Sequence, residues 1–203
     1  VANGDDFAAW VPGPAGEVGL TRRLTIALDA MGGDHAPAAA VEGAAIARER
    51  YPNVSFLLFG DQAALTSLVA AYPKLAAVSE IRHTDEVVSA DDKPSQALRR
   101  GRGSSMGLAI AAVQEGEADV AVSAGNTGAL MAMAKFMLKT MPGIDRPALA
   151  TILSSSRGEC VMLDLGANVE CDARNLVEFA VMGAAFARTV LGIPRPRVAL
   201  LNV

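Results

Sequence analysis

The sequence contains little cysteine and histidine, the residues that most often build disulfide frameworks and zinc sites. Its 203 residues include two of each. Cys160 and Cys171 do not form a C-x-x-C pair, and the histidines show no ligand spacing, which argues against a disulfide framework or a metal site. We interpret both cysteines as reduced, buried thiols of a cytosolic protein.

Aromatic residues are also scarce, at 4% of the chain. The volume of a core must therefore come from Ala, Val, Leu, Ile and the 8 Met residues, a mixture that suits helices packed closely on a buried sheet. Hydrophobic residues make up 51% of the chain, which excludes disorder of the whole sequence.

Positive charge and long apolar runs are limited as well. The net charge of −4 argues against nucleic acid as the main partner. No uncharged apolar run reaches the ~18 residues of a transmembrane helix, because Lys135 and Lys139 interrupt the run 128–141. Residues 1–22 lack the basic start and apolar core of a signal peptide, so we interpret 1–23 as a flexible N-terminal extension.

From Leu24 onward, short apolar runs alternate with helical patterns. We predict strands at 24–31, 54–60, 80–84, 118–125, 148–155, 160–166 and 197–203, and helices at 38–51, 61–72, 105–115, 127–140 and 172–192. This alternation predicts an α/β fold with a mostly parallel sheet and helices on both faces. No linker composition divides residues 24–203, so we expect one domain there. Because nothing follows strand 197–203, we expect this domain to be the N-terminal part of a longer protein.

Ligands of open α/β sheets bind beyond the carboxyl ends of the strands, and three loops fit that position. The first is "DAMGGDHAP" (29–37). Asp29 ends its strand, Gly32 and Gly33 let the backbone approach a ligand closely, and Asp34 and His35 add polar groups. The alternative is an ordinary strand-to-helix turn with Asp34 near the helix cap. The loop is not G-x-G-x-x-G, so a dinucleotide fingerprint is absent.

The second loop is "SAGNTGALMA" (123–132), where an apolar run stops at Ser123 and a helix follows. Gly125 and Gly128 remove side chains, while Asn126 and Thr127 supply donors. Free N–H groups and the positive end of the helix dipole converge there, which favours an anionic oxygen of phosphate or of a developing oxyanion. The alternative is that Asn126 or Thr127 caps the helix and does nothing more.

The third loop, "DDKPSQALRRGRGSSMG" (91–107), carries four cations within ten positions: Lys93, Arg99, Arg100 and Arg102. Such a patch binds phosphate or steers an acidic partner, and the alternative is a solvated charged face. Ser104 and Ser105 are candidates for an anion contact or for the cap of the next helix.

A fourth glycine turn, "DLGANVECD" (164–172), gathers Asp164, Asn168, Glu170 and Asp172, of which Asp172 most simply caps the following helix. No Ser–His–Asp or Cys–His arrangement stands out, and Ser123 is not in a G-x-S-x-G elbow.

Six blocks stand in order along residues 24–203: "IALDAMGGDHAP", "DKPSQALRRGRGSSMGLA", "VSAGNTGALMA", "GIDRPALAT", "DLGANVECDARNLVEFAVMGAAFA" and "PRVALLNV". Together they resemble the phosphate acyltransferase (PlsX) family of bacterial phospholipid synthesis. The resemblance implies an enzyme without a cofactor that converts acyl-[acyl carrier protein] and inorganic phosphate into acyl phosphate and free carrier protein. It also implies the fold of phosphate acetyltransferases and isocitrate dehydrogenases, a homodimer, a cytoplasmic or peripheral membrane location, and a membrane glycerol-3-phosphate acyltransferase as partner.

In this reaction phosphate attacks the thioester directly, so no protein nucleophile is required, and the enzyme must hold a dianion and stabilise an oxyanion. The expected catalytic residues are Asp29, Asp34, His35, Lys93 and Asn126. The expected phosphate- or substrate-binding residues are Gly32, Gly33, Lys93, Arg99, Ser123, Gly125, Asn126, Thr127, Gly128 and Asn168. We expect Arg100 and Arg102 to meet the acidic carrier protein.

Three other functions stay open at this point. Acetyl or butyryl transfer from coenzyme A to phosphate would use similar loops. A non-catalytic membrane scaffold of lipid synthesis would not need the polar residues of three loops. A metal- and NAD-dependent decarboxylating dehydrogenase of the related fold is the third.

Overall fold

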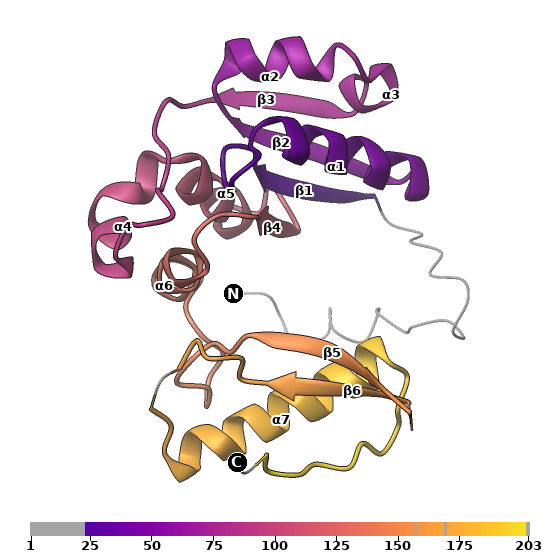
Figure 1. Cartoon of the computed structure of the whole chain (residues 1–203), viewed down its shortest axis with the longest axis vertical. Helices are drawn as coiled ribbons and strands as arrows, with labels where there is room; N and C mark the ends of the chain where they lie inside the picture. The colour runs from indigo at the N-terminus through magenta and orange to yellow at the C-terminus, as the bar shows by residue number, and fades with distance from the viewer. Residues whose placement is uncertain (1–22, 157, 169, 202–203) are drawn as a thin grey trace. The chain divides into compact units, whose positions relative to one another are not determined.

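The computed structural model describes residues 23–156, 158–168 and 170–201. The predicted extension, Arg23 apart, lies outside these residues. The chain forms two compact units, of which the first ends at Lys139 and the second begins at Thr140 (Figure 1). The expectation of one domain over residues 24–203 stays a prediction.

Four parallel strands form the sheet of the first unit: β1 (Leu24–Asp29), β2 (Val54–Gly60), β3 (Ser79–His83) and β4 (Val120–Ser123). Their order is β3-β2-β1-β4. The chain passes from β1 to β2 on one side, whereas β4 pairs with β1 on the other side. The direction of the strand order therefore changes between β1 and β4, and this is where open α/β sheets bind ligands.

Helices cover both faces of this sheet, as predicted. The helices α1 (Ala38–Arg50), α2 (Gln62–Val69) and α3 (Pro73–Ala76) pack on one face, and α5 (Ser105–Gln114) packs on the other. Neighbouring strand residues alternate between the faces: Leu58 belongs to the core under α1 and α2, and Leu57 to the core under α5. The helix α5 meets the sheet through Ala109 and Ala112, whose small side chains permit close packing.

A second layer of helices lies beside the sheet. It contains α4 (Pro94–Arg100), the short 3₁₀ helix η2 (Gly101–Gly103) and α6 (Thr127–Leu138). Ala97 of α4 and Met133 of α6 share one buried cluster. The segment of α4 is predicted from the sequence as part of a loop, so the helix at Pro94–Arg100 corrects that prediction.

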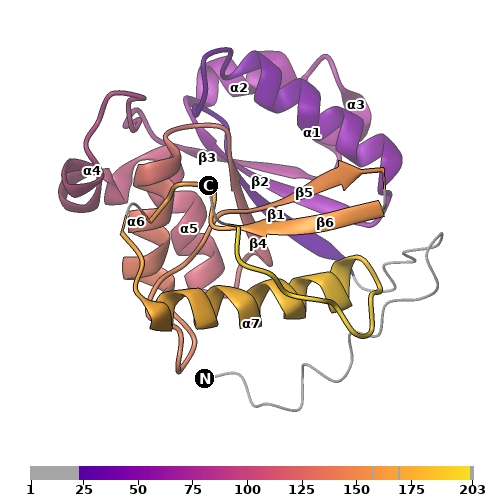
Figure 2. The same ribbon diagram turned by 60° about the horizontal axis from the view of Figure 1, so that its bottom comes forward.

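The second unit contains an antiparallel hairpin of β5 (Ala150–Ser155) and β6 (Gly158–Leu163), with α7 (Ala173–Val190) running alongside (Figure 2). Only two residues separate Ser155 from Gly158, which is too few for a parallel crossover. The predicted strand at 197–203 is wrong for residues 197–201, which form no strand; residues 202–203 lie outside the described part.

The long helix α7 buries Phe179 and exposes an apolar strip that includes Val177 and Val181, with 63% and 58% of their surfaces accessible. That a second subunit or another part of the protein covers this strip stays a prediction. Cys160 and Cys171 have no disulfide, but both are exposed, so their predicted burial is wrong. Among the described residues, no helix combines the length and apolarity needed to cross a membrane.

Candidate anion-binding site

A buried carboxylate and a serine join the carboxyl ends of the two strands at the switch point. Asp29 and Ser123 are register partners in β1 and β4. The Ser123 hydroxyl donates to Asp29 Oδ2 at 2.6 Å and accepts from the N–H of Gly125 at 3.0 Å. Asp29 is 2% exposed. This chain of hydrogen bonds fixes the start of the loop after β4, so Asp29 and Ser123 hold the site in shape.

Two of the predicted glycine loops touch directly above this pair. A Cβ on Gly32 would lie 2.4 Å from Asp29 Oδ2, and a Cβ on Gly125 would lie 3.3 Å from Gly32 Cα. Gly33 has a φ of 102° and lies against Ala124. Only glycine permits this approach, because any side chain at Gly32 would displace the carboxylate.

Asn126 uses both ends of its carboxamide inside the protein. Its Oδ1 accepts from the N–H of Ala129 at 3.0 Å, which caps α6. Its Nδ2 donates to the carbonyl oxygens of Ala90 and Asp92, each at 2.9 Å, and of Ser89 at 3.3 Å. Of the two roles that the sequence leaves open for Asn126, capping is therefore found.

Lys93 is the last residue of the loop that Asn126 holds and the cap residue before α4. Its side chain is exposed, and it has no ion-pair partner in the described part of the chain. The next residue, Pro94, lies against the first turn of α6, because a Cβ on Gly128 would be 3.2 Å from Pro94 Cγ. Lys93 is the sequence neighbour of this Pro94 contact, and Thr127 and Gly128 are both exposed, with first-turn N–H groups that face no intrahelical acceptor. The arrangement suits an anion.

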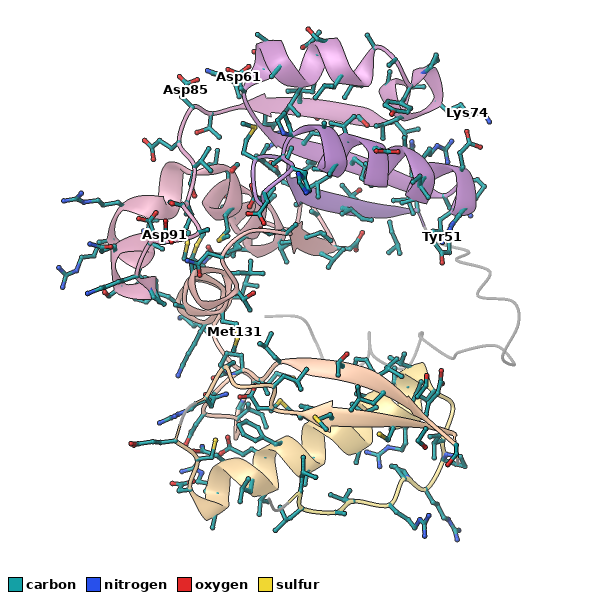
Figure 3. All side chains as sticks on the ribbon, in the orientation of Figure 1. Tyr51, Asp61, Lys74, Asp85, Asp91 and Met131 are labelled. Carbon is teal, nitrogen blue, oxygen red and sulfur yellow. The ribbon has the colours of Figure 1, made fainter. Side chains whose placement is uncertain are left out.

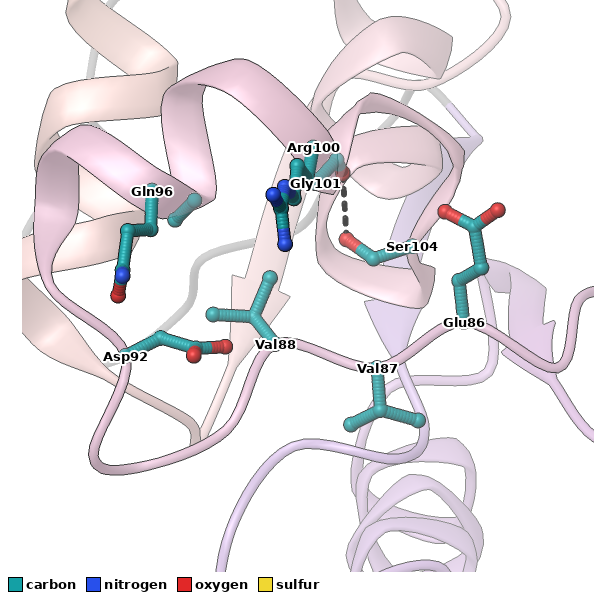
Figure 4. Close-up of a pocket in the computed structure, with 9 residues that line it drawn as sticks. Glu86, Val87, Val88, Asp92, Gln96, Arg100, Gly101 and Ser104 are labelled. Carbon is teal, nitrogen blue, oxygen red and sulfur yellow. Dashed lines mark hydrogen bonds between the residues drawn. The ribbon is translucent and has the colours of Figure 1, made fainter.

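The three arginines of the basic segment occupy different places. Arg99 lies six residues after Lys93, roughly 9 Å further along the helix at 1.5 Å per residue. Arg100 lines a pocket of about 310 Å³ together with Glu86, Asp92 and Gln96. Figure 4 shows its guanidinium directed toward Val88. Arg102 lies over the ring of Phe136, 5.4 Å from the centroid.

Two predicted residues of the first loop show no fixed contact. Asp34 and His35 are exposed, and no hydrogen bond of their side chains is found within the described residues. Pro37 precedes α1 as its cap residue, so Asp34 does not cap that helix. Ser104 caps α5, accepting from the N–H of Gly107, and donates to the carbonyl of Gly101 (Figure 4).

Asn168 belongs to the second unit, where it orders the turn after β6. Asp164 accepts from the N–H of Asn168 at 2.7 Å and from that of Leu149 at 2.7 Å. The Asn168 amide donates to the carbonyl of Pro147 at 3.0 Å. Asp172 caps α7, as predicted. In this unit Asn168 has a structural part, and its role toward phosphate stays a prediction.

Charge is strongly segregated around the site. Residues 93–114 and 120–144 contain no Asp or Glu, although the whole chain carries 22 such residues against 18 Lys and Arg. Six cations lie in these two segments: Lys93, Arg99, Arg100, Arg102, Lys135 and Lys139. The helices α4 and α6 therefore carry only positive charges in a protein whose net charge is negative, while Asp91 and Asp92 directly precede Lys93. Among the described residues, no three His, Cys, Asp or Glu side chains are grouped to hold a metal ion.

Comparison with known proteins identifies the family of this chain. The family described as "Fatty acid synthesis protein" matches residues 24–203. The chain belongs to this family. The chain is 65% identical over 184 residues to a protein of Rhodospirillum centenum named phosphate acyltransferase, and 60% identical over 184 residues to one of Rhodospirillum rubrum with the same name. Both matches confirm the resemblance predicted from the six blocks.

Each match covers 91% of this chain, but only 52% and 53% of the two relatives. The chain thus spans about half the length of the curated relatives it matches. Among solved structures, EutD phosphotransacetylase from Staphylococcus aureus has a TM-score of 0.58 and 21% sequence identity, over 81% of this chain and 53% of that one. This likeness confirms the predicted α/β fold class.

Proposed function

We propose that this family member carries the phosphate-binding part of an acyltransferase that acts on acyl-[acyl carrier protein] and inorganic phosphate. Family membership and the names of the relatives support the reaction class. The observation that carries the proposal is the contact of the Gly32 and Gly125 loops at the strand switch point, with Pro94, the residue after Lys93, against the first turn of α6.

In the proposed reaction a phosphate oxygen attacks the carbonyl carbon of the thioester. The C–O bond forms, the C–S bond breaks, and the carrier-protein thiolate takes the proton that phosphate loses. The protein supplies no nucleophile. The charge of phosphate is compensated by the N–H groups of Thr127 and Gly128 and by the ammonium of Lys93. The loops at Gly32 and Gly125 have no side chains at these positions and so leave room for the thioester.

The carrier protein is acidic, and the carboxylate-free surface of α4 and α6 complements it. Arg102 and Phe136 are part of this surface: Phe136 is 58% exposed, and the guanidinium over its ring combines charge with an apolar face. Arg100 instead lines the pocket of Figure 4, so we assign only Arg102 to carrier-protein docking.

The test uses a hybrid enzyme in which this chain replaces the matched half of the Rhodospirillum centenum relative. The assay follows phosphate-dependent release of free carrier protein from palmitoyl-carrier protein, and acetyl- and butyryl-coenzyme A are offered as competing donors. The proposal expects activity with the carrier-protein donor. Activity with coenzyme A donors alone contradicts it, as does a folded hybrid that is inactive while the unmodified relative is active.

Location and assembly are part of the same proposal. We place the enzyme in the cytoplasm or at the inner face of the membrane, as a homodimer that delivers acyl phosphate to a membrane glycerol-3-phosphate acyltransferase. The exposed apolar strip of α7, which includes Val177 and Val181, supports cover by a further protein surface.

A further inference from the structure

We propose that Asn126 is a positioning residue, which ties the loop Ser89–Lys93 to the first turn of α6 and so places the Lys93 ammonium for phosphate. The inference rests on the proposed function for its last step. Its first step, the tie itself, concerns only the contacts of one side chain. Figure 3 shows this loop, with Asp91 labelled, next to α4, and Met131 labelled on α6.

The orientation of the Asn126 carboxamide follows from its neighbours. An N–H group, that of Ala129, faces one end of the amide, and carbonyl oxygens face the other end. Only the arrangement with Oδ1 toward the N–H and Nδ2 toward the carbonyls avoids two donors or two acceptors in opposition. Both ends of the carboxamide are already hydrogen-bonded within the protein. Direct binding of phosphate would therefore require Asn126 to break one of these hydrogen bonds.

The carbonyls that Nδ2 binds belong to a turn with its own hydrogen bonds. Ser89 N–H donates to Asp92 Oδ2 at 2.8 Å, and Asp92 N–H donates to the carbonyl of Ser89 at 3.2 Å. The turn therefore has internal hydrogen bonds of its own, and Lys93 is the residue that follows Asp92. The side chain of Asn126, the cap residue of α6, binds this turn. Gly128 lies close to Pro94, so the two segments also meet at a second point.

Substitution by serine separates capping from tying. Serine caps a helix about as well as asparagine does, and it is neutral, but it is too short to reach the carbonyls of the turn. Asn126→Ser therefore keeps the cap of α6 and removes the tie. The matched control, Asn126→Ala, removes both, and Lys93→Met removes the charge that the tie is proposed to place.

Hydrogen–deuterium exchange on the 203-residue chain tests, without any substrate, whether the hydrogen bonds of Asn126 stabilise the turn. Asn126→Ser should speed exchange of the amides at 89–93 about tenfold or more and leave the first turns of α6 unchanged, whereas Asn126→Ala should speed both. Unchanged exchange at 89–93 in Asn126→Ser overturns the proposal, and this holds even if the hybrid enzyme shows no transferase activity.

The phosphate dependence of the hybrid enzyme tests the second step, which is the placement of the Lys93 ammonium for phosphate. Asn126→Ser and Lys93→Met should each raise the KM for phosphate about tenfold with a smaller change in kcat, and the double variant should be no worse than Lys93→Met alone. Multiplying effects in the double variant would show that Asn126 acts on phosphate by itself, which contradicts positioning through Lys93. An inactive unmodified hybrid counts against the proposed function, while the exchange result still decides the tie.

Discussion

Replacing Gly32 by alanine should destabilise the first unit. The new Cβ would lie 2.4 Å from Asp29 Oδ2, 2.9 Å from Ser123 Oγ and 3.0 Å from the backbone nitrogen of Gly125. The carboxylate cannot simply turn away, because it is buried and hydrogen-bonded to Ser123. Either the two loops separate or the buried hydrogen bond breaks. Overpacking and loss of a charge-assisted hydrogen bond each cost about 1–3 kcal/mol, so either outcome should lower the free energy of unfolding by about 1–3 kcal/mol.

The chain offers a matched control at Gly43 of α1. Nothing lies within 4 Å of a Cβ at that position. Gly43→Ala should therefore stabilise the protein by about 0.5–1 kcal/mol through helix propensity. The measurement is urea unfolding of the 203-residue chain followed by circular dichroism. If Gly32→Ala unfolds at the same urea concentration as the unmodified protein, the close approach of the two loops is refuted.

Three further predictions follow from the same structure. Ser123→Ala should lower the free energy of unfolding by about 1–3 kcal/mol, since it removes the hydroxyl that donates to Oδ2 of the buried Asp29 and leaves the N–H of Met31 as a donor to Oδ1; Ser123→Thr, which keeps the hydroxyl, should restore most of this in the same urea titration. Arg102→Ala should raise the KM for acyl-carrier protein in the hybrid enzyme and flatten its salt dependence, and an effect on phosphate KM alone would assign this arginine to the anion site. Val177→Ser with Val181→Ser should change the stability of the 203-residue chain by less than about 0.5 kcal/mol per site but weaken self-association of the hybrid in analytical ultracentrifugation; unchanged association would show that this strip is not an interface.

The sheet of the first unit follows closely from the sequence. The strand at 54–60 is found with its predicted ends, because its continuous apolar run is buried on both faces. The helix α4 was missed although its signals are local: Pro94 opens it, Gln96 accepts from the N–H of Lys93, and Gly101 follows its last turn. Turn residues and charge obscured a helix of only seven residues.

The errors in the second unit have a different cause. A strand exists only when another strand pairs with it, so the apolar run at 197–201 does not become one by composition alone. Among the described residues of this unit, β5 and β6 pair only with each other. The exposure of Cys160 likewise depends on what covers the hairpin, and a single apolar segment does not specify its cover.

The candidate site was predicted in its residues more than in their roles. The contact of the Gly32 and Gly125 loops follows from parallel strands that end at one edge. The hydrogen bonds of Asn126 to the turn at Ser89 and Asp92 join residues more than thirty positions apart. No periodicity or motif signals such a long-range pair, so the sequence predicted the helix cap as one of two roles but not the tie, and the role of Asn126 toward an anion stays a prediction.

We propose that the loops beyond β1 and β4 belong to an enzyme that moves an acyl group from carrier protein to phosphate. The most direct measurement is release of free carrier protein from palmitoyl-carrier protein by the hybrid enzyme, titrated with inorganic phosphate. We expect the release to require phosphate, to saturate as phosphate is added, and to yield one acyl phosphate for each carrier protein that is released. Release that is independent of phosphate, or that yields free fatty acid from the outset, would contradict it.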